Sequence, residues 1–575
     1  MVKWGRYILI CTACWVLAGY SCKKKSVVTP EPEVPVVIDP AVDPPVASTT
    51  GFFLDAWTPK TFTVPPAVAT TPPAAAVYTI SVDRSKVMSK ISPALFGSNA
   101  NLWMTQIVDQ PVLMDHLKKL SPSVIRFPGG SISDVFFWNR DKDAPPADAP
   151  SAFVKADGST ETAGFWYGKN GDGWTFSVNN YYQLLQQTNS KGLITINYGY
   201  ARYGTGADPV AAAAHLAADW VRYDNGRTMY WEIGNENFGD WEAGYRIATA
   251  SNKDGQPEFI SGQLYGQHFK VFADSMRKAA AAIGKQIYIG AVMVEAESPA
   301  WATATHRNWN TGLLGSIGNS ADYYVLHNYY TAFQTNASAA EILATPASET
   351  GKMTNFVKST FSTNASSVKP LVLDEWNIFS TGSQQQVSHI NGMHAVLVLG
   401  EAMKQQLGLT ARWDLANGWD NGNDHGMFSQ GEAASGETKW QPRPAFYHMY
   451  YFQQTAGDRL VESTHSIPGT LVYATSFSSG ETALAIVNTS TASYTTKIDI
   501  KNFIKGDKYY WYTLTGDNDN GEFSRKVIVN GNNAAGVAGG PSNYATLAAR
   551  SAAATGDIKV EVPARSTVFL VVDNK

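Results

Sequence analysis

Two glutamates lie in motifs whose residue types could carry out acid–base and nucleophilic chemistry. Glu236 closes the apolar stretch "MYWEIGNE", and Glu375 lies in "PLVLDEW". Hydrolysis of a glycosidic bond uses such a pair of carboxyl groups, one on each side of the bond that is cut. When the carboxyls lie about 5–5.5 Å apart, the second attacks the sugar directly and the anomeric configuration is retained. The two residues are 139 positions apart (375 − 236), so only the fold can bring them together.

The elements that would position these glutamates are short apolar runs that alternate with amphipathic helical patterns, such as those over 208–223 and 265–284. Strands alternating with helices predict right-handed βαβ units and a parallel sheet, and eight such strands fit a closed (β/α)8 barrel, or TIM barrel. A doubly wound open sheet is the alternative, disfavoured because no glycine-rich phosphate loop follows the first strand. The eight predicted strands are 94–99, 123–127, 193–199, 229–234, 286–292, 322–328, 370–375 and 411–415.

The active site of a (β/α)8 barrel is built at the carboxyl ends of its strands. Strands 4 and 7 lie nearly opposite each other in the ring, so Glu236 and Glu375 can face the same mouth. Arg126 ends strand 2, and an arginine close to Glu375 would lower the pKa of that carboxyl and keep it ionised. The charge of Glu375, together with burial beside aromatic side chains such as Trp231, is expected to raise the pKa of Glu236.

Other polar side chains fall at the same end of the predicted barrel. His327 and Tyr329 follow strand 6 in "LHNYY", and either could donate a hydrogen bond to Glu375. Asp374 directly precedes Glu375, so the alternation of a strand points it the other way and predicts a structural role. No pattern indicates a metal site or an organic cofactor.

Four motifs together resemble those of a known clan of enzymes. "RFPGG", "WEIGNE", "LHNYY" and "LDEWN", in this order and spacing, resemble retaining glycoside hydrolases whose catalytic glutamates lie on barrel strands 4 and 7. Over residues 77–575 the chain looks most like the α-L-arabinofuranosidases of glycoside hydrolase family 51. The resemblance implies that Glu236 is the acid/base, that Glu375 is the nucleophile and that Asn235 binds the sugar 2-hydroxyl.

The chain departs from family 51 in two loops. After "PGG" it continues "SISDVFFWN", and after "GNE" it continues "NFGDWEAGY". Loops select the substrate, whereas the barrel carries the chemistry, so these departures bear on substrate choice. The prediction is a retaining hydrolase of polysaccharide or oligosaccharide, first an α-L-arabinofuranosidase. The alternatives are an endo-acting β-glycanase of the same clan, such as a glucanase or xylanase, and a non-catalytic glycan-binding surface lipoprotein.

Tryptophans near the mouth are candidates to stack on a sugar ring; they are Trp376, Trp103, Trp138 and Trp419. Their arrangement would separate two modes of action. An exo-acting enzyme is expected to have a closed pocket behind Glu375, and an endo-acting enzyme an open groove lined by several tryptophans.

The N-terminus has the features of an export signal. Lys3 and Arg6 precede a short apolar run, and "AGYSC" ends at Cys22, which predicts a lipoprotein-type signal peptide over 1–22 with Cys22 as the lipidated residue. Gly19 stands where a large aliphatic residue is usual, and a plain signal peptide is the alternative. All three cysteines lie in the first 22 residues, so no internal disulfide or cysteine metal site is expected. We expect an outer-membrane or cell-surface lipoprotein on the periplasmic or extracellular side.

The rest of the chain divides by composition. Residues 23–76 contain 11 of the 28 prolines and favour an extended tether, in which the apolar island 51–57 is a candidate to dock on the folded body. The barrel is expected over 77–454, and the short alternating runs of 455–575 predict an antiparallel β-sandwich that 77–88 could join. The net charge of −4, with no long basic run beyond the N-terminus, argues against a nucleic-acid partner.

Overall fold

The computed structural model describes residues 38–379, 385–418, 425–517 and 522–575. The expected signal peptide, Cys22 and Trp419 lie outside these ranges. None of the helices within them combines the length and the apolar character that crossing a membrane requires. Residues 39–575 form one compact unit, which contains both folded parts described below.

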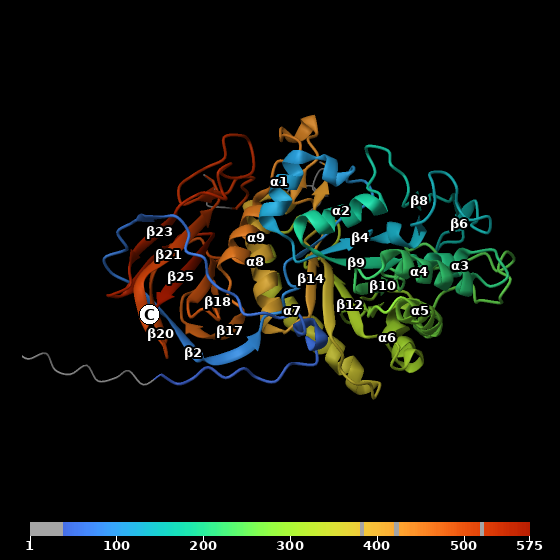
Figure 1. The fold of residues 1–575 in the computed structure, drawn as a ribbon, viewed down its shortest axis with the longest axis horizontal. Helices are drawn as coiled ribbons and strands as arrows, with labels where there is room; N and C mark the ends of the chain where they lie inside the picture. The colour runs from blue at the N-terminus through green and yellow to red at the C-terminus, as the bar shows by residue number, and fades with distance from the viewer. Residues whose placement is uncertain (1–37, 380–384, 419–424, 518–521) are drawn as a thin grey trace, which may run out of the picture. The chain divides into compact units, whose positions relative to one another are not determined.

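Eight parallel strands close into a barrel, and their order around it is β10-β11-β12-β13-β14-β3-β4-β9. Each contains residues of one of the eight predicted strands, so the predicted (β/α)8 fold is confirmed. All residues of β4, β10 and β13 are buried, because helices cover the outside and side chains fill the inside (Figure 1). The strands are β3 (Gly97–Asn99), β4 (Val124–Phe127), β9 (Lys191–Ile196), β10 (Tyr230–Ile233), β11 (Tyr288–Val292), β12 (Tyr323–Asn328), β13 (Leu371–Trp376) and β14 (Leu409–Arg412).

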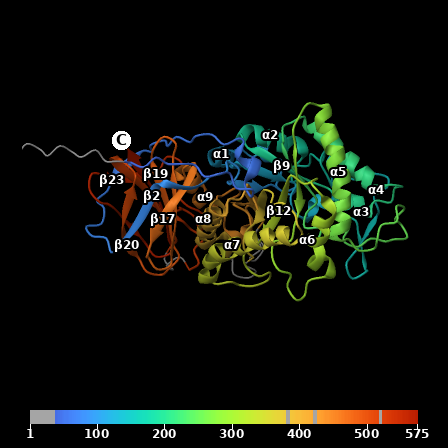
Figure 2. The same ribbon diagram turned by 90° about the horizontal axis from the view of Figure 1, so that it is seen from below.

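The helices of the barrel follow the predicted alternation, and α4, α5 and α6 lie outside the strands in both views (Figures 1 and 2). Several begin at a side chain that accepts a hydrogen bond from a free backbone N–H, for example Asp208 before α4 and Ser261 before α5. The helices are α1 (Pro111–Leu120), α2 (Val178–Thr188), α3 (Gly199–Tyr203), α4 (Pro209–Asp224), α5 (Gly262–Ala282), α6 (Ala304–Ile317), α7 (Ala339–Thr363), α8 (His389–Lys404) and α9 (Pro444–Thr455).

The loop after β4 is long and carries structure of its own. It contains the short helix η3 (Ser131–Val135) and four short strands that form two small sheets above the barrel. These strands are β5 (Phe136–Phe137), β6 (Ala152–Val154), β7 (Thr160–Thr162) and β8 (Trp166–Tyr167).

The C-terminal part is the predicted β-sandwich, an 11-stranded and largely antiparallel sheet around a second apolar core. The strand β2, which precedes the barrel in sequence, lies between β17 and β20. Tyr473 of this part donates to Glu401 of α8, and Phe452 of α9 stacks on Phe569, so the two folded parts pack together. The main strands are β2 (Tyr78–Lys90), β17 (Arg459–His465), β18 (Thr470–Ser476), β19 (Thr482–Asn488), β20 (Tyr494–Lys501), β21 (Lys505–Thr515), β23 (Ala549–Ala553), β24 (Ile558–Val562) and β25 (Ser566–Asn574).

The described portion of the proline-rich segment runs against the folded body rather than standing free of it. Phe52 stacks on Tyr288 with ring centroids 3.8 Å apart, and Phe53, 1% exposed, packs against Tyr230. Tyr230 and Tyr288 open β10 and β11, so these rings cover the amino-terminal end of the barrel. Further along, the ammonium of Lys60 donates to two backbone carbonyls at the end of α9. The described part of the predicted tether is therefore docked on the folded body by aromatic side chains, although its prolines favour an extended chain.

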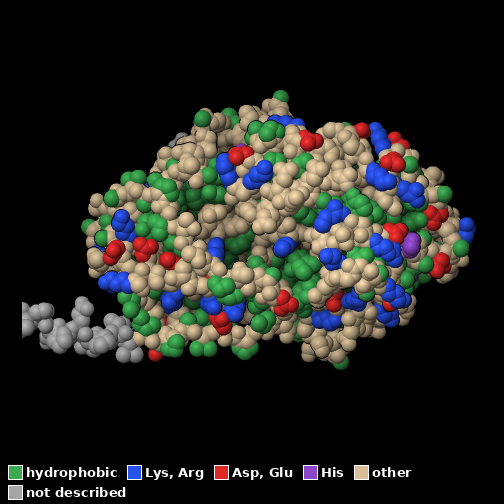
Figure 3. Space-filling model, viewed as in Figure 1, with side chains coloured by type: hydrophobic (Ala, Val, Ile, Leu, Met, Phe, Trp, Pro, Cys, Tyr) green, Lys and Arg blue, Asp and Glu red, His purple; other side chains and the backbone are tan. Residues whose placement is uncertain are grey.

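Charged side chains of both signs are interspersed over the face seen in Figure 3. This distribution agrees with the small net charge and presents no broad basic surface on that face.

Candidate active site

The carboxyl ends of β4, β10, β12 and β13 converge on one cluster of buried ionisable side chains. Arg126 ends β4, Glu232 lies on β10, His327 lies on β12 and Glu375 lies on β13. Glu236 follows β10 after a tight turn and has a φ of +42°, in the left-handed region that non-glycine residues rarely adopt. Such backbone conformations gather at functional sites.

The two glutamates singled out from the sequence face each other across His327. One carboxyl oxygen of Glu236, one of Glu375 and a ring nitrogen of His327 all lie within 4.8 Å of one another. Nδ1 of His327 donates to Glu236 Oε1 at 2.8 Å and lies 3.9 Å from Glu375 Oε2. The side chain of Glu236 is 19% exposed and that of Glu375 only 7%, so Glu375 lies deeper in the barrel.

Both oxygens of Glu375 are held by donors. Arg126 Nη1 donates to Oε2 at 2.8 Å, and the hydroxyl of Tyr329 donates to Oε1 at 2.8 Å. The ring of Tyr329 is itself fixed by stacking on Phe379, with centroids 4.2 Å apart. The carboxylate of Glu375 is therefore fixed in orientation before any ligand enters.

Arg126 is the hub of the cluster and is completely buried. Its guanidinium pairs through Nε with Glu232 at 2.8 Å and donates through Nη2 to Asn235 Oδ1 at 2.9 Å. The "PGG" that follows Phe127 makes room for this hub. A Cβ on Gly129 would lie 2.8 Å from Asn99 Oδ1 and 3.1 Å from Arg126 Nη1, and a Cβ on Gly130 would lie 2.5 Å from Trp413. Both glycines also have positive φ, which explains the motif physically.

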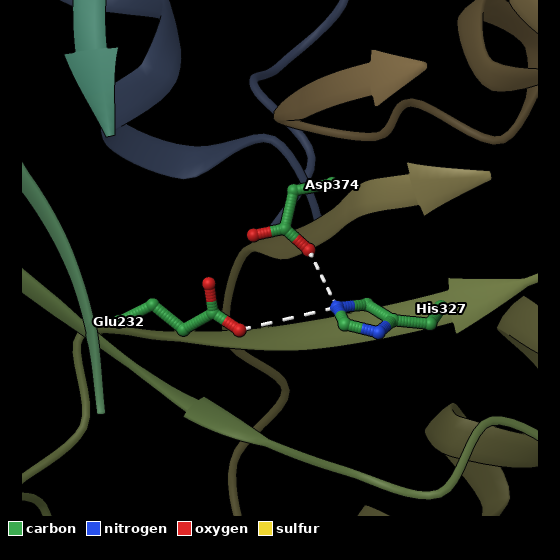
Figure 4. Close-up of side chains that lie close together, drawn as sticks. All are labelled: Glu232, His327 and Asp374. Atoms are coloured by element: carbon green, nitrogen blue, oxygen red, sulfur yellow. Dashed lines mark ion pairs between the residues drawn. The ribbon is translucent and has the colours of Figure 1, made fainter. Parts of the chain in front are cut away.

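The expectation that Asp374 points away from the site is wrong. Its carboxyl lies 3.5 Å from Arg126 Nε and 3.2 Å from His327 Nε2. Figure 4 shows that Asp374 and Glu232 both face this same ring nitrogen of His327. The pairing of β13 with β14 shifts register between Leu373 and Trp376. This irregularity breaks the alternation of the strand, so that two consecutive carboxyl groups both face the barrel interior.

The electrostatics of the pair also differ from the sequence expectation. Burial alone would raise the pKa of Glu236, but hydrogen bonds from His327 and Trp241 lower it below its ordinary value. Burial raises the pKa of Glu375, and its attraction to His327 and Arg126 offsets only part of this effect. Burial would lower the pKa of His327, yet the surrounding carboxylates raise it well above its ordinary value. These directions favour the proton on His327 over the proton on Glu236.

Two groups of side chains in the described ranges have the composition of a metal site: Glu232, His327 and Asp374, and Glu236, His327 and Glu375. Arg126 already supplies a fixed positive charge to both groups, through Glu232 and through Glu375. The arrangement is that of a charge network centred on arginine, and it fits acid–base chemistry better than cation binding.

The candidate sugar-stacking tryptophans are not all at the mouth. The prediction that Trp138 stacks on a sugar is wrong, because its ring stacks on Trp220 of α4 and its indole N–H donates to a backbone carbonyl of the same helix. Trp376 is completely buried and offers no face to a ligand. Trp103 is half-buried near the mouth, edge-on to Trp413 with centroids 6.3 Å apart.

Three side chains that the sequence argument did not single out belong to the site. Glu232 pairs with Arg126, and burial raises its pKa to about 7. Trp241, 52% exposed, donates to Glu236 Oε2 at 3.1 Å. Phe379 stacks on Tyr329. A charged residue within a buried strand is unusual, and Glu232, four residues before Glu236, could have been noticed on that ground. The sequence does not show that its partner is Arg126.

A hollow of about 410 Å3 opens above the cluster. Glu236, His327 and Tyr329 line it, together with Trp241 and Trp301. Trp301 is 73% exposed, so the hollow has wide aromatic walls on the solvent side.

Comparison with solved structures finds the same arrangement of folded parts in several enzymes. The α-L-arabinofuranosidase from Thermotoga maritima, solved with arabinose, matches with a TM-score of 0.59 at 17% identity, over 86% of this chain and 99% of its own. CelM2, a bifunctional glucanase-xylanase from a metagenome library, matches with a TM-score of 0.55 at 15% identity, over 87% and 99%. A family 44 xyloglucanase from Paenibacillus polymyxa matches with a TM-score of 0.54 at 11% identity, over 87% and 100%.

These findings define the fold of the chain as a (β/α)8 barrel with a C-terminal β-sandwich. More particularly, this is the fold of family 51 arabinofuranosidases and of related glycanases, as the sequence motifs led us to expect. No family model matches the chain, and neither does any curated protein.

Proposed function

We propose that the protein is a retaining glycoside hydrolase, with Glu375 as the nucleophile and Glu236 as the acid/base. The observation that carries the proposal is the separation of at most 4.8 Å between a carboxyl oxygen of Glu236 and one of Glu375 at the mouth of the barrel. Retaining enzymes hold their two carboxyls about 5–5.5 Å apart, whereas inverting enzymes leave about 6.5–9.5 Å for a water molecule.

The first step breaks the glycosidic C–O bond. A carboxylate oxygen of Glu375 attacks the anomeric carbon and forms an ester, while Glu236 gives a proton to the departing oxygen. Arg126 and Tyr329 hold the two oxygens of Glu375 in place. The proton reaches Glu236 from His327 across their 2.8 Å hydrogen bond, since His327 holds the proton in the free protein.

The second step releases the sugar. Glu236, now a carboxylate, takes a proton from a water molecule, and the resulting hydroxide attacks the anomeric carbon and breaks the ester to Glu375. The sugar leaves with its original configuration. Because hydrogen bonds from His327 and Trp241 lower the pKa of Glu236, the proton taken from water then passes from Glu236 back to His327, which restores the starting state.

The stereochemistry of the product tests this proposal directly. Proton NMR of the first product formed from an aryl glycoside is expected to show the anomer of the substrate. An inverted first product would refute the role of Glu375. Absence of turnover on every substrate, with glycan binding preserved, would instead support the non-catalytic glycan-binding alternative.

Two substrate classes follow from different observations. The likeness of fold to arabinofuranosidases supports α-L-arabinofuranosidase activity on polysaccharide side chains. The exposed Trp241 and Trp301 beside the catalytic hollow favour the endo-acting alternative, in which a backbone lies across the mouth. A panel of aryl α-L-arabinofuranosides, xylan, β-glucan and arabinan separates the two, because only an endo-acting enzyme lowers the viscosity of a polymer early in the reaction.

We also propose that the protein is a lipoprotein anchored through Cys22, on the strength of the signal-like sequence over 1–22. A palmitate label on the wild-type chain that is lost in Cys22→Ala, together with loss of the protein from the membrane fraction, is the expected result. An unlabelled wild-type chain would leave the plain signal peptide as the explanation.

A further inference from the structure

A second hollow, of about 730 Å3, lies beside the catalytic one. Trp241 lines both hollows and donates to Glu236, so the second hollow continues from the catalytic mouth. Its walls come from two segments, 131–166 after β4 and 240–243 after β10. The lining residues Ser131, Ile132, Val135 and 240–243 lie in the two stretches in which the sequence departs from family 51.

The walls of the second hollow are fixed by hydrogen bonds. Ser131 Oγ donates to Glu242 Oε1 at 2.7 Å and thereby ties the two loops together. Arg246 donates through Nη1 to the backbone carbonyl of Ala156 at 3.0 Å and pairs with Glu258 on its other side. A hollow held open in this way loses little freedom when a ligand enters, which favours binding.

One buried polar group of the wall has no partner. Glu242 is 5% exposed and lines the hollow. Its Oε1 accepts from Ser131 and from Asn235 Nδ2, whereas its Oε2 has no hydrogen-bond partner among the described residues. A buried polar atom without a partner is costly, so a ligand hydroxyl that hydrogen-bonded to this oxygen would be stabilised there.

The remaining lining fits a neutral sugar. Trp166 and Trp241 line the hollow from its two different segments. One lysine, Lys155, is opposed by three carboxyl side chains, those of Asp157, Glu161 and Asp240, whereas burial raises the pKa of the fourth, Glu242, well above its ordinary value. This excess of negative charge disfavours a uronate or a sulfated sugar, because like charges placed together cost binding energy. The volume lies within the range of about 300–1,000 Å3 that is usual for small-ligand sites.

We propose that this second hollow binds the neutral sugar units that adjoin the reacting unit of the polysaccharide, with Trp166 as a stacking platform and Glu242 as a hydrogen-bonding partner. The inference rests on the proposed glycosidase function and deepens it. The protein would recognise several consecutive units of an uncharged chain rather than one terminal sugar.

The test measures how binding depends on chain length. In the Glu375→Gln background, isothermal titration with xylo-, arabino- and cello-oligosaccharides of two to six units is expected to show at least a tenfold gain in affinity with length for one series. Trp166→Ala is expected to remove that gain. Tyr223→Ala, at an aromatic residue 43% exposed on α4, is the matched control and is expected to keep it. Galacturonate oligomers are expected to bind at least tenfold more weakly than the best neutral series.

Turnover separates this inference from the proposed function. In the catalytically competent protein, Trp166→Ala is expected to lower the ratio of kcat/KM on the polymer to kcat/KM on an aryl glycoside at least tenfold. An affinity independent of length in every series, or equal effects of Trp166→Ala and Tyr223→Ala, would overturn the inference and leave the glycosidase intact. Length-dependent binding that Trp166→Ala abolishes, in a protein that hydrolyses nothing, would support the hollow and refute the glycosidase.

Discussion

The two ends of the barrel show opposite chemistry. At the carboxyl end, Arg126, His327 and four carboxyl groups are packed into a small, largely buried volume. At the amino-terminal end, the aromatic rings of Phe52 and Phe53 pack on Tyr288 and Tyr230, the first residues of β11 and β10. Burying charged groups destabilises the fold even when they are paired, whereas burying aromatic rings stabilises it. The apolar packing at the amino-terminal end, the closed end, therefore stabilises the barrel. It offsets the free energy that burying the charged cluster costs at the carboxyl end, the open end.

The largest expected effect belongs to the open end. Glu375→Gln and Glu236→Gln are each expected to lower kcat by at least about 10³-fold, because each removes a group that forms or breaks a bond. Circular dichroism and thermal melting check that the fold persists. A variant with near-wild-type turnover would show that the paired carboxyls are not the catalytic pair.

The next largest effect is expected at the amino-terminal, closed end of the barrel and concerns stability rather than turnover. Phe53→Ala is expected to lower the free energy of unfolding by about 3 kcal/mol, because it empties a buried aromatic site. Urea denaturation followed by tryptophan fluorescence measures the change. Val68→Ala, in the same segment at a side chain 60% exposed, is the control and is expected to cost less than about 0.5 kcal/mol. Equal costs for the two variants would mean that the rings do not brace the barrel.

A smaller change at the open end tests orientation rather than bond making. Tyr329→Phe keeps the ring stacked on Phe379 and removes the hydrogen bond to Glu375. Turnover is expected to fall about tenfold, equivalent to about 1.4 kcal/mol. Steady-state kinetics at saturating substrate measures it. An unchanged kcat would assign the fixing of Glu375 to Arg126 alone.

The smallest effect is the pH dependence of stability. The pKa of His327 is raised in the folded state by Glu375, Asp374 and Glu236, so the folded protein holds this proton more tightly than the unfolded chain. The stabilisation is complete below the unfolded pKa of about 6.5 and is lost as pH rises through the folded pKa, by up to about 1.4 kcal/mol per pH unit.

Urea denaturation at a series of pH values above about 6.5 measures this slope. His327→Asn is expected to flatten it, and His215→Asn, at an exposed position on α4, is expected to leave it unchanged. A slope that survives in His327→Asn would place the tightly held proton elsewhere in the cluster.

The fold and the core of the site could be predicted because their signals are local. Most barrel strands lie in short, mainly apolar runs, and Arg126, Asn235, His327 and Tyr329 lie at or just beyond strand ends, where a barrel places its functional groups. The structure brings these four side chains together around Glu375. Their catalytic and sugar-binding roles stay predictions.

What the sequence could not supply depends on contacts between distant segments. The orientation of Asp374 follows from a shift in strand register, and the burial of Trp138 follows from its packing on α4. The pKa of Glu236 is lowered because His327 lies 2.8 Å away, which no spacing in the sequence states. Glu242 is identified as part of the site region only from its hydrogen bond with Ser131, which joins two loops that are distant in sequence.

The position of β2 has a consequence for how the chain is made. This strand lies between β17 and β20 in the sandwich, although the whole barrel separates it from them in sequence. At synthesis rates of about 5–20 residues per second, β2 leaves the ribosome about 20–70 s before its neighbour β17 exists. Both of its edges stay unpaired during that interval, and an unpaired edge invites pairing with other chains. Chaperone protection of the growing chain is thus most valuable while the barrel is being synthesised, and the sandwich closes last, joining the segments that precede and follow the barrel.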